Sequence, residues 1–264
     1  MMSKLLKVSL LIGVLLLTVS CFGVRVRGSG NVISEKREVR DFDSVQLNSF
    51  GDVFIEQGDQ PGVIIEADDQ LLEYVSAEVR AGKLHLDVGE NGQSVSVTNA
   101  ELRYLVTVTD LEEIRISGSG DISVDDLSID DLEISIGGSG DIMAEEIEGD
   151  QLTLSIGGSG DIEIKEVKLN EVDTGISGSG SIELSGQTDQ HSIRVGGSGS
   201  YDAADLESQV VDVRIQGSGN AEIWAVESLD ITIGGSGDVR YYGDPSDLKQ
   251  SVSGSGDVRG MGDK

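Results

Sequence analysis

The sequence has few of the residues that most often carry cross-links, metal sites or catalysis. Its 264 residues include one cysteine, two histidines and two prolines, and only 4% are aromatic. One cysteine cannot form an internal disulfide or a cysteine-based zinc site, and two histidines cannot supply a histidine-rich metal site. Lysine and arginine total 19 against 48 acidic residues, and the formal net charge of −29 argues against a nucleic-acid partner.

Residues 1–20 are typical of a secretory signal peptide. Lys4 and Lys7 give the segment a positive start, and an apolar run follows from Leu10 to Val19. The run is too short for a comfortable membrane span. We therefore expect export of the chain and removal of this segment.

The only cysteine directly follows the predicted signal peptide. Ser20 precedes Cys21, so the segment resembles a bacterial lipoprotein signal in which Cys21 becomes the lipidated first residue. The alternative is ordinary cleavage that leaves a free thiol. If Cys21 is lipidated, residues 21–30 form a lipidated N-terminus and short linker, joined to the membrane through the lipid. Phe22 follows the cysteine, which by resemblance to lipoprotein sorting implies the outer membrane of a diderm bacterium, and otherwise the outer face of the cell membrane.

A repeat of about 20 residues dominates the rest of the chain. The tripeptide Gly-Ser-Gly begins eight times, at Gly118, Gly138, Gly158, Gly178, Gly197, Gly217, Gly235 and Gly254. Between these corners apolar residues alternate with polar ones, as in Leu152-Leu154-Ile156, and this period of two predicts strands with one buried face. Each copy is predicted as a strand, a Gly-Ser-Gly corner, a strand and a short acidic turn.

Such a unit cannot bury its apolar face alone, but stacked copies form a continuous core. The pattern therefore predicts an all-β fold, a parallel β-helix or solenoid with rungs of about 20 residues, over residues 116–264. An antiparallel sandwich or barrel is the alternative. Glycine is expected at the corners because it adopts backbone angles that other residues avoid, and a small serine lets corners approach. Proline is expected to be rare because it removes a donor from the ladder.

Residues 31–115 are less regular. Alternation around Val45–Leu47 and Val53–Glu56 predicts strands, and Leu71–Val75 could form one helical turn. This region is either a separate cap or a set of degenerate first rungs. A solenoid needs its ends covered, because an open strand edge recruits other strands.

Four segments carry a family resemblance. They are REVRDFDSVQLNSFGDVFIEQGD at 37–59, VIIEADDQLLEYV at 63–75, GKLHLDV at 82–88 and LEEIRISGSGDI at 111–122. Together they resemble the head GIN domain family, which carries the label "putative auto-transporter adhesin" and is in practice a family of unknown function. The resemblance covers nearly all of residues 31–258. It implies a secreted or lipid-anchored bacterial protein with a right-handed parallel β-helix, and it provides no catalytic residues.

An acidic residue follows most corners and is the sharpest candidate for a ligand site. If the corners stack, their carboxylates lie roughly 4.8 Å apart and repel one another, and a bound Ca²⁺ would relieve this repulsion. The favoured alternative is that each aspartate bonds its own backbone and keeps the solenoid soluble. The candidate calcium ligands are Asp121, Asp141, Asp161, Asp238 and Asp257, with Asn220, Ser181 and Ser200 at the other corners.

An enzyme is the remaining alternative, because many parallel β-helices cleave acidic polysaccharides. The serines of the repeat do not form a nucleophile elbow, which needs a strand-to-helix turn. The cations of the repeats are scattered, and an acidic surface would repel acidic sugars. His191 is predicted to be a packed core residue, His85 to face water, and Trp224 with Tyr241 and Tyr242 to serve in core or end-cap packing.

The sequence thus predicts a secreted, lipid-anchored, non-catalytic module of the cell envelope, with an interaction or structural role. It needs no cofactor. Besides the membrane, we expect a surface partner that is a protein or a glycan, and the sequence identifies neither this partner nor the oligomeric state.

Overall fold

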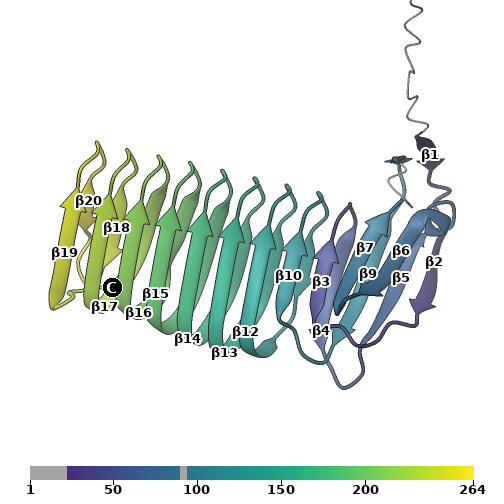
Figure 1. Ribbon diagram of the computed structural model, residues 1–264, viewed down its shortest axis with the longest axis horizontal. Coiled ribbons are helices and arrows are strands. Elements are labelled where there is room, and N and C mark those ends of the chain that lie inside the picture. Colours follow the sequence, from purple (N-terminus) through teal and green to yellow (C-terminus); the bar gives the residue numbers. More distant parts are fainter. Residues whose placement is uncertain (1–22, 90–93) are drawn as a thin grey trace, which may run out of the picture.

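The computed structural model describes residues 23–89 and 94–264 (Figure 1). The predicted signal peptide and Cys21 lie outside these residues. The strands of the N-terminal region are β1 (Val24–Arg27), β2 (Val32–Arg37), β3 (Ser44–Leu47), β4 (Asp52–Gln57), β5 (Gly62–Asp68), β6 (Val75–Arg80), β7 (Lys83–Val88), β8 (Val95–Thr98) and β9 (Leu102–Val108), with a 3-10 turn η1 at Leu72–Tyr74. In the described part of the chain, no helix is long and apolar enough to span a bilayer.

The repeat region continues with further strands that stack along one axis (Figure 1). They are β10 (Glu113–Ile116), β11 (Ile122–Val124), β12 (Leu127–Ile136), β13 (Ile142–Ile156), β14 (Ile162–Ile176), β15 (Ser181–Val195), β16 (Ser200–Ile215), β17 (Asn220–Ile233), β18 (Val239–Tyr242), β19 (Asp247–Val252) and β20 (Val258–Gly260). Each copy pairs in parallel with the next, so that Ile142 lies beside Ile162 and Ile162 beside Ile182. The predicted parallel β-solenoid is confirmed, and the antiparallel alternative is wrong for the repeats.

The second corner is an acidic turn, as predicted, only where Asp125 and Asp126 separate β11 from β12; from β13 to β17 it lies within a continuous strand. Strand β13 runs without a break from Ile142 to Ile156, and its ladder to β14 continues around the bend through pairs such as Glu146 with Glu166. The acidic residues of this bend therefore belong to curved, hydrogen-bonded strands. Gly149 lies in the bend with a φ of 153°. A Cβ at this position would lie 1.9 Å from the Ile129 carbonyl oxygen, so there is no room for a side chain.

The Gly-Ser-Gly corners are built on close approach of the backbone. The Ser159 N–H donates to the Gly138 carbonyl across 3.0 Å, and a Cβ at Gly158 would lie 1.9 Å from that same oxygen. None of the eight corners from Gly118 to Gly256 uses the left-handed region of φ, so the expectation of unusual backbone angles is wrong here. Both prolines, Pro61 and Pro245, lie in loops outside the ladders, as expected.

The N-terminal region combines coil-like and cap-like structure. Strands β3 and β4 pair in parallel with β10 and β11, so residues 44–57 form one coil whose corner is Asn48–Gly51. Strands β7 and β9 then stack in parallel on β3 and β4. Strands β2, β5 and β6 pair antiparallel at this end and cover it, while β1 and β8 form a separate small sheet. The division into two domains stays a prediction.

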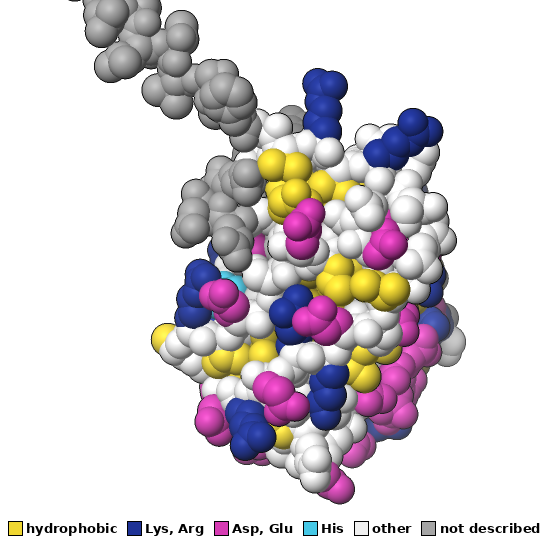
Figure 2. All heavy atoms as spheres, turned by 90° about the vertical axis from the view of Figure 1, so that its right-hand side faces the viewer, with side chains coloured by type: hydrophobic (Ala, Val, Ile, Leu, Met, Phe, Trp, Pro, Cys, Tyr) yellow, Lys and Arg dark blue, Asp and Glu magenta, His cyan; other side chains and the backbone are white. Residues whose placement is uncertain are grey.

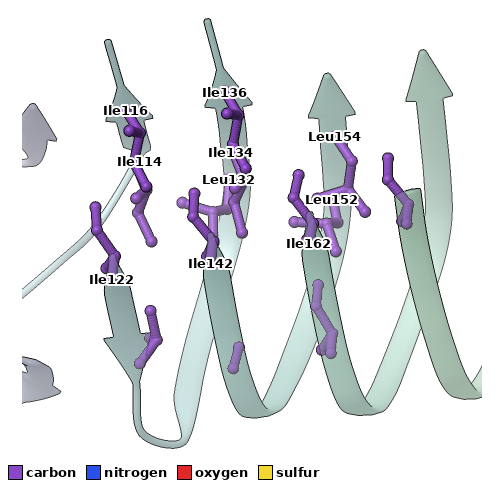
Figure 3. Packing of buried hydrophobic residues seen from close by; sticks show 14 of the residues in the cluster. Ile114, Ile116, Ile122, Leu132, Ile134, Ile136, Ile142, Leu152, Leu154 and Ile162 are labelled. Carbon is purple, nitrogen blue, oxygen red and sulfur yellow. The ribbon is translucent and has the colours of Figure 1, made fainter. Parts of the chain in front are cut away.

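One hydrophobic core runs through the described chain. Figure 3 shows Ile114, Ile134 and Leu152 pointing into the interior of neighbouring coils. All three side chains are fully buried. Isoleucine, leucine and valine fill this narrow space, which explains the shortage of aromatic residues. Phe42, Tyr104 and Tyr201 are the aromatic side chains that are buried in this core among the described residues.

Candidate interaction surfaces

The corner aspartates join one coil to the next. The Asp161 backbone N–H donates to Asp141 Oδ1 at 2.8 Å, and the Ser181 N–H donates to Asp161 Oδ1 at 2.6 Å. Asn220 plays the same part near the C-terminus, where its Oδ1 accepts from the Asp238 N–H at 2.9 Å. The expectation that each aspartate bonds its own backbone is therefore wrong, because the stacked corner brings the next coil's N–H closer.

The five calcium candidates lie in one column of corners, as two stretches of these hydrogen bonds that are separated by Ser181 and Ser200. Asp121 accepts from the Asp141 N–H at 2.9 Å, and Asp238 accepts from the Asp257 N–H at 2.8 Å. In residues 23–89 and 94–264, no group of three or more histidine, cysteine or acidic side chains has the arrangement of a metal site. The role that this geometry supports directly is stitching of the corners, and calcium binding stays a prediction.

Asp141 provides a test of the stitching role. We expect Asp141→Ala to lower the free energy of unfolding by about 1 kcal/mol, because the Asp161 N–H loses its acceptor. Asp141→Asn should retain wild-type stability or exceed it, because an amide oxygen serves at Asn220 and one carboxylate leaves the ladder. Urea unfolding followed by circular dichroism measures both. Equal losses in the two variants would mean that charge, and not the hydrogen bond, holds the corner.

A buried polar cluster lies within the solenoid. His191 is 3% exposed, and its Nε2 lies 2.5 Å from the Tyr201 hydroxyl and its Nδ1 lies 3.0 Å from Ser208 Oγ. Ser208 Oγ donates to the Leu206 carbonyl, so Nδ1–H donates to Ser208 and the Tyr201 hydroxyl donates to Nε2. Burial lowers the pKa of His191 to about 3 and raises that of Tyr201. His191 is a packed core residue as predicted, and the proton of Ser208 is committed to the backbone.

The other singled-out side chains lie near the surface. His85 is half-buried and pairs with Glu78 across β6 and β7. Trp224 and Tyr242 are also half-buried, and the Lys264 ammonium lies 5.8 Å and 5.3 Å from their ring centres. This contact holds the last described residues against the side of the solenoid, in keeping with the predicted packing role.

A row of outward-facing apolar side chains crosses the N-terminal sheet. Parallel and antiparallel registers align Phe54 with Leu105, Leu105 with Ile64, and Ile64 with Lys36. Both Phe54 and Ile64 are apolar although they occupy the solvent side of their strands, where they are 42% and 38% exposed. A groove of about 370 Å³ runs along these residues. We call Phe54, Leu105 and Ile64 the apolar row.

The same outward position is acidic farther along the solenoid. From β14 to β17 it is occupied by Glu163, Glu183, Asp202 and Glu222, which are aligned one per coil. Arg240 on β18 pairs with Glu222 at 2.5 Å. This column therefore changes from the apolar row through Ser123 and the exposed Met143 to an acidic stretch over β14–β17.

The sequence carries a signal for the apolar row that alternation alone did not reveal. Val53-Phe54-Ile55 and Val63-Ile64-Ile65 are runs of three apolar residues on half-exposed strands. Strict alternation would place a polar residue at the centre of each run. Val53, Ile55, Val63 and Ile65 are buried, so each central residue faces outward.

A family model decides which proteins this chain is related to. The model described as "Putative auto-transporter adhesin, head GIN domain" matches residues 41–245. The chain belongs to this family. The resemblance noted in the sequence is thereby confirmed. A search of curated proteins found no match.

Two solved structures share the fold. A protein from Parabacteroides distasonis described as a "putative lipid binding protein" is 27% identical, with a TM-score of 0.83 over 90% of this chain and 99% of its own. A "putative adhesin" from Parabacteroides merdae is 26% identical, with a TM-score of 0.81 over 90% of this chain and 100% of its own. Both matches extend over the solenoid and its N-terminal end.

Proposed function

We propose that this head GIN protein is an exported, lipid-anchored and non-catalytic interaction module of the bacterial envelope. The adhesin label of its family and of the Parabacteroides merdae relative supports a surface role. The observation that carries the proposal is the apolar row, because Phe54 and Ile64 are exposed side by side on adjoining strands, whereas the same outward position is acidic from β14 to β17. Exposed apolar side chains gathered in one place mark contact sites.

The arrangement of the surface favours a protein partner over an acidic glycan. Phe54, Leu105 and Ile64 offer apolar area that a partner's apolar side chains would remove from water. The acidic stretch over β14–β17 repels anionic partners, which restricts docking to the N-terminal part. The solenoid holds this site rigidly, because every strand of the site belongs to the main 18-stranded sheet.

The contact site can be tested by site-specific photo-crosslinking in intact cells. We expect a benzoylphenylalanine at position 54 to give a discrete adduct, because the partner covers the apolar row. Val210 is the matched control, since it is an apolar residue with 44% exposure on β16. Immunoblots of irradiated cells report the adducts. Adducts of equal intensity from positions 54 and 210, or none from position 54, would contradict the proposal.

The anchor can be tested independently of the partner. We expect cells fed an alkynyl palmitate analogue to label the wild-type chain and to lose this label in Cys21→Ala. The cysteine is unique in the sequence, so no second thiol can carry the lipid. In-gel fluorescence after click chemistry measures the label. Equal labelling of both chains would refute the anchor and leave the contact site untouched.

A further inference from the structure

The C-terminal end of the solenoid is an open strand edge. Strand β19 pairs with β17 on one side, and β20 pairs with β18 on one side. Among the described residues no strand pairs with their other sides. Residues 261–264 turn back along the solenoid, where Lys264 Nζ donates to the Ala204 carbonyl at 2.6 Å. The opposite end is covered by the antiparallel strands of the N-terminal region.

The core is incomplete at this open edge. Leu248 and Val252 continue the inward columns of Leu229 and Ile233, as their register shows. Leu229 and Ile233 are fully buried, whereas Leu248 is 40% exposed and Val252 is 46% exposed. A strand laid against β19 would bury both side chains and would pair with the backbone N–H and C=O groups on the open side of β19.

The charge of this edge differs from that of the rod. Strands β19 and β20 and the corner between them carry Asp247, Asp257, Lys249 and Arg259, so their formal charges cancel. Strand β13, by contrast, carries four acidic residues and no lysine or arginine. Two copies of a chain with net charge −29 repel each other over most of their surfaces. The neutral end is the place where a second copy meets the least repulsion.

The edge is also complementary to itself. Leu248, Gln250 and Val252 face inward, in the order apolar, polar, apolar. A two-fold axis through Gln250 and normal to the sheet places Leu248 opposite Val252 of the second copy and sets the two glutamine side chains together. The same axis brings β20 beside its own counterpart on the other face. An interface of this kind uses the same patch on both subunits and closes at two.

We infer that the chain forms a two-fold dimer through the open edges of β19 and β20. The occupant of the edge is a second copy, joined C-terminal end to C-terminal end, with the two N-terminal regions at the far ends of a doubled rod. The covered end of Figure 2, with basic and acidic side chains interspersed, stays free for other contacts. The dimer is independent of the apolar row and of the anchor.

Light scattering of the purified chain tests the dimer. A chain starting at residue 22 contains every described residue, and size-exclusion chromatography with multi-angle light scattering is expected to give twice the monomer mass. Leu248→Lys with Val252→Lys should weaken association by about tenfold or more, because four like charges meet at the axis. Val210→Lys, at a similarly exposed valine far from the edge, should leave the dimer intact. Monomer at all concentrations, or an open-ended polymer formed by head-to-tail contact, would overturn the inference.

A cysteine at the axis tests the same geometry in the full chain. Gln250→Cys is expected to give a disulfide-linked dimer in an oxidising envelope, because the axis sets the two side chains together. Gln187→Cys, an exposed position on β15, should give none. Non-reducing gels report the product. Absence of the Gln250→Cys dimer, or equal crosslinking at both positions, would contradict the two-fold arrangement.

Discussion

Replacing Gly158 with alanine is expected to lower the free energy of unfolding by about 3 kcal/mol or more, a large share of the stability of a single domain. The new Cβ would lie 1.9 Å from the Gly138 carbonyl oxygen and 2.9 Å from the Gly137 carbonyl carbon, both in the preceding coil. Neither coil can move away, because the Ser159 and Ser179 N–H groups tie both sides of the corner to adjacent coils at 3.0 Å.

The preceding residue provides the matched control. A Cβ at Gly157 would meet only the Ile136 carbonyl oxygen, at 3.9 Å, which is an ordinary contact. The chain itself places Ser117, Ser177 and Gln216 at this position in other coils, whereas the position of Gly158 is glycine in all eight. Gly157→Ala should therefore change stability by less than about 1 kcal/mol. Urea unfolding measures both, and equal losses would exclude close approach as the reason for the glycine.

Acidification is expected to destabilise the fold through His191. Its pKa is about 3 in the folded chain and about 6.5 when unfolded, so the unfolded chain binds the extra proton between these values. This contribution to stability is fully present above pH 6.5 and decreases by about 1.4 kcal/mol for each pH unit below it, down to about pH 3. The protonated ring would have to remain in an apolar interior, where charge is costly.

A variant that borrows residues from adjacent coils isolates this effect. His191 lies between Val172 and Val211, Tyr201 lies beside Ile182, and Ser208 lies beside Ala225. The combined variant His191→Val, Tyr201→Ile and Ser208→Ala removes the three side chains that bond one another. The Leu206 carbonyl loses the Ser208 hydroxyl as a donor, a cost that does not depend on pH. Between pH 6.5 and 4.5 it should lose about 2 kcal/mol less stability than the wild type, because the carboxylates are common to both chains.

The pH profile has two readouts. Urea unfolding at several pH values gives the difference between the chains, and parallel profiles would contradict the assignment to His191. Nuclear magnetic resonance of the wild-type imidazole reports the protonation state directly. The ring is expected to stay neutral at pH 5 for as long as the chain remains folded.

The repeat made the solenoid predictable, because a fixed spacing between corners determines which residues of neighbouring coils lie side by side. Ile142, Ile162 and Ile182 align in the structure as their spacing indicates. The insertion at residues 58–108 has no such repeat. Its strands β7 and β9 stack on β3 and β4 through long-range pairs that no local pattern specifies.

The candidate surfaces were less accessible to sequence reasoning for a related reason. The partner of a corner aspartate lies one coil away, so its identity depends on the stacking distance and not on neighbouring residues. His191 was predictable as a core residue from its inward column, but Tyr201 and Ser208 approach it from other columns of the interior. The apolar row had a local signal, because Phe54 and Ile64 interrupt the alternation of their strands.

The regular register between the first full coils has a consequence for the evolution of length. Because β12, β13 and β14 pair without a register shift, loss or duplication of one copy of about 20 residues there would let the ladder close again. Each such event would change the separation between the apolar row and the β19 edge by roughly 4.8 Å and leave both surfaces unaltered. The length of the rod is thus a property that this architecture can vary in whole steps.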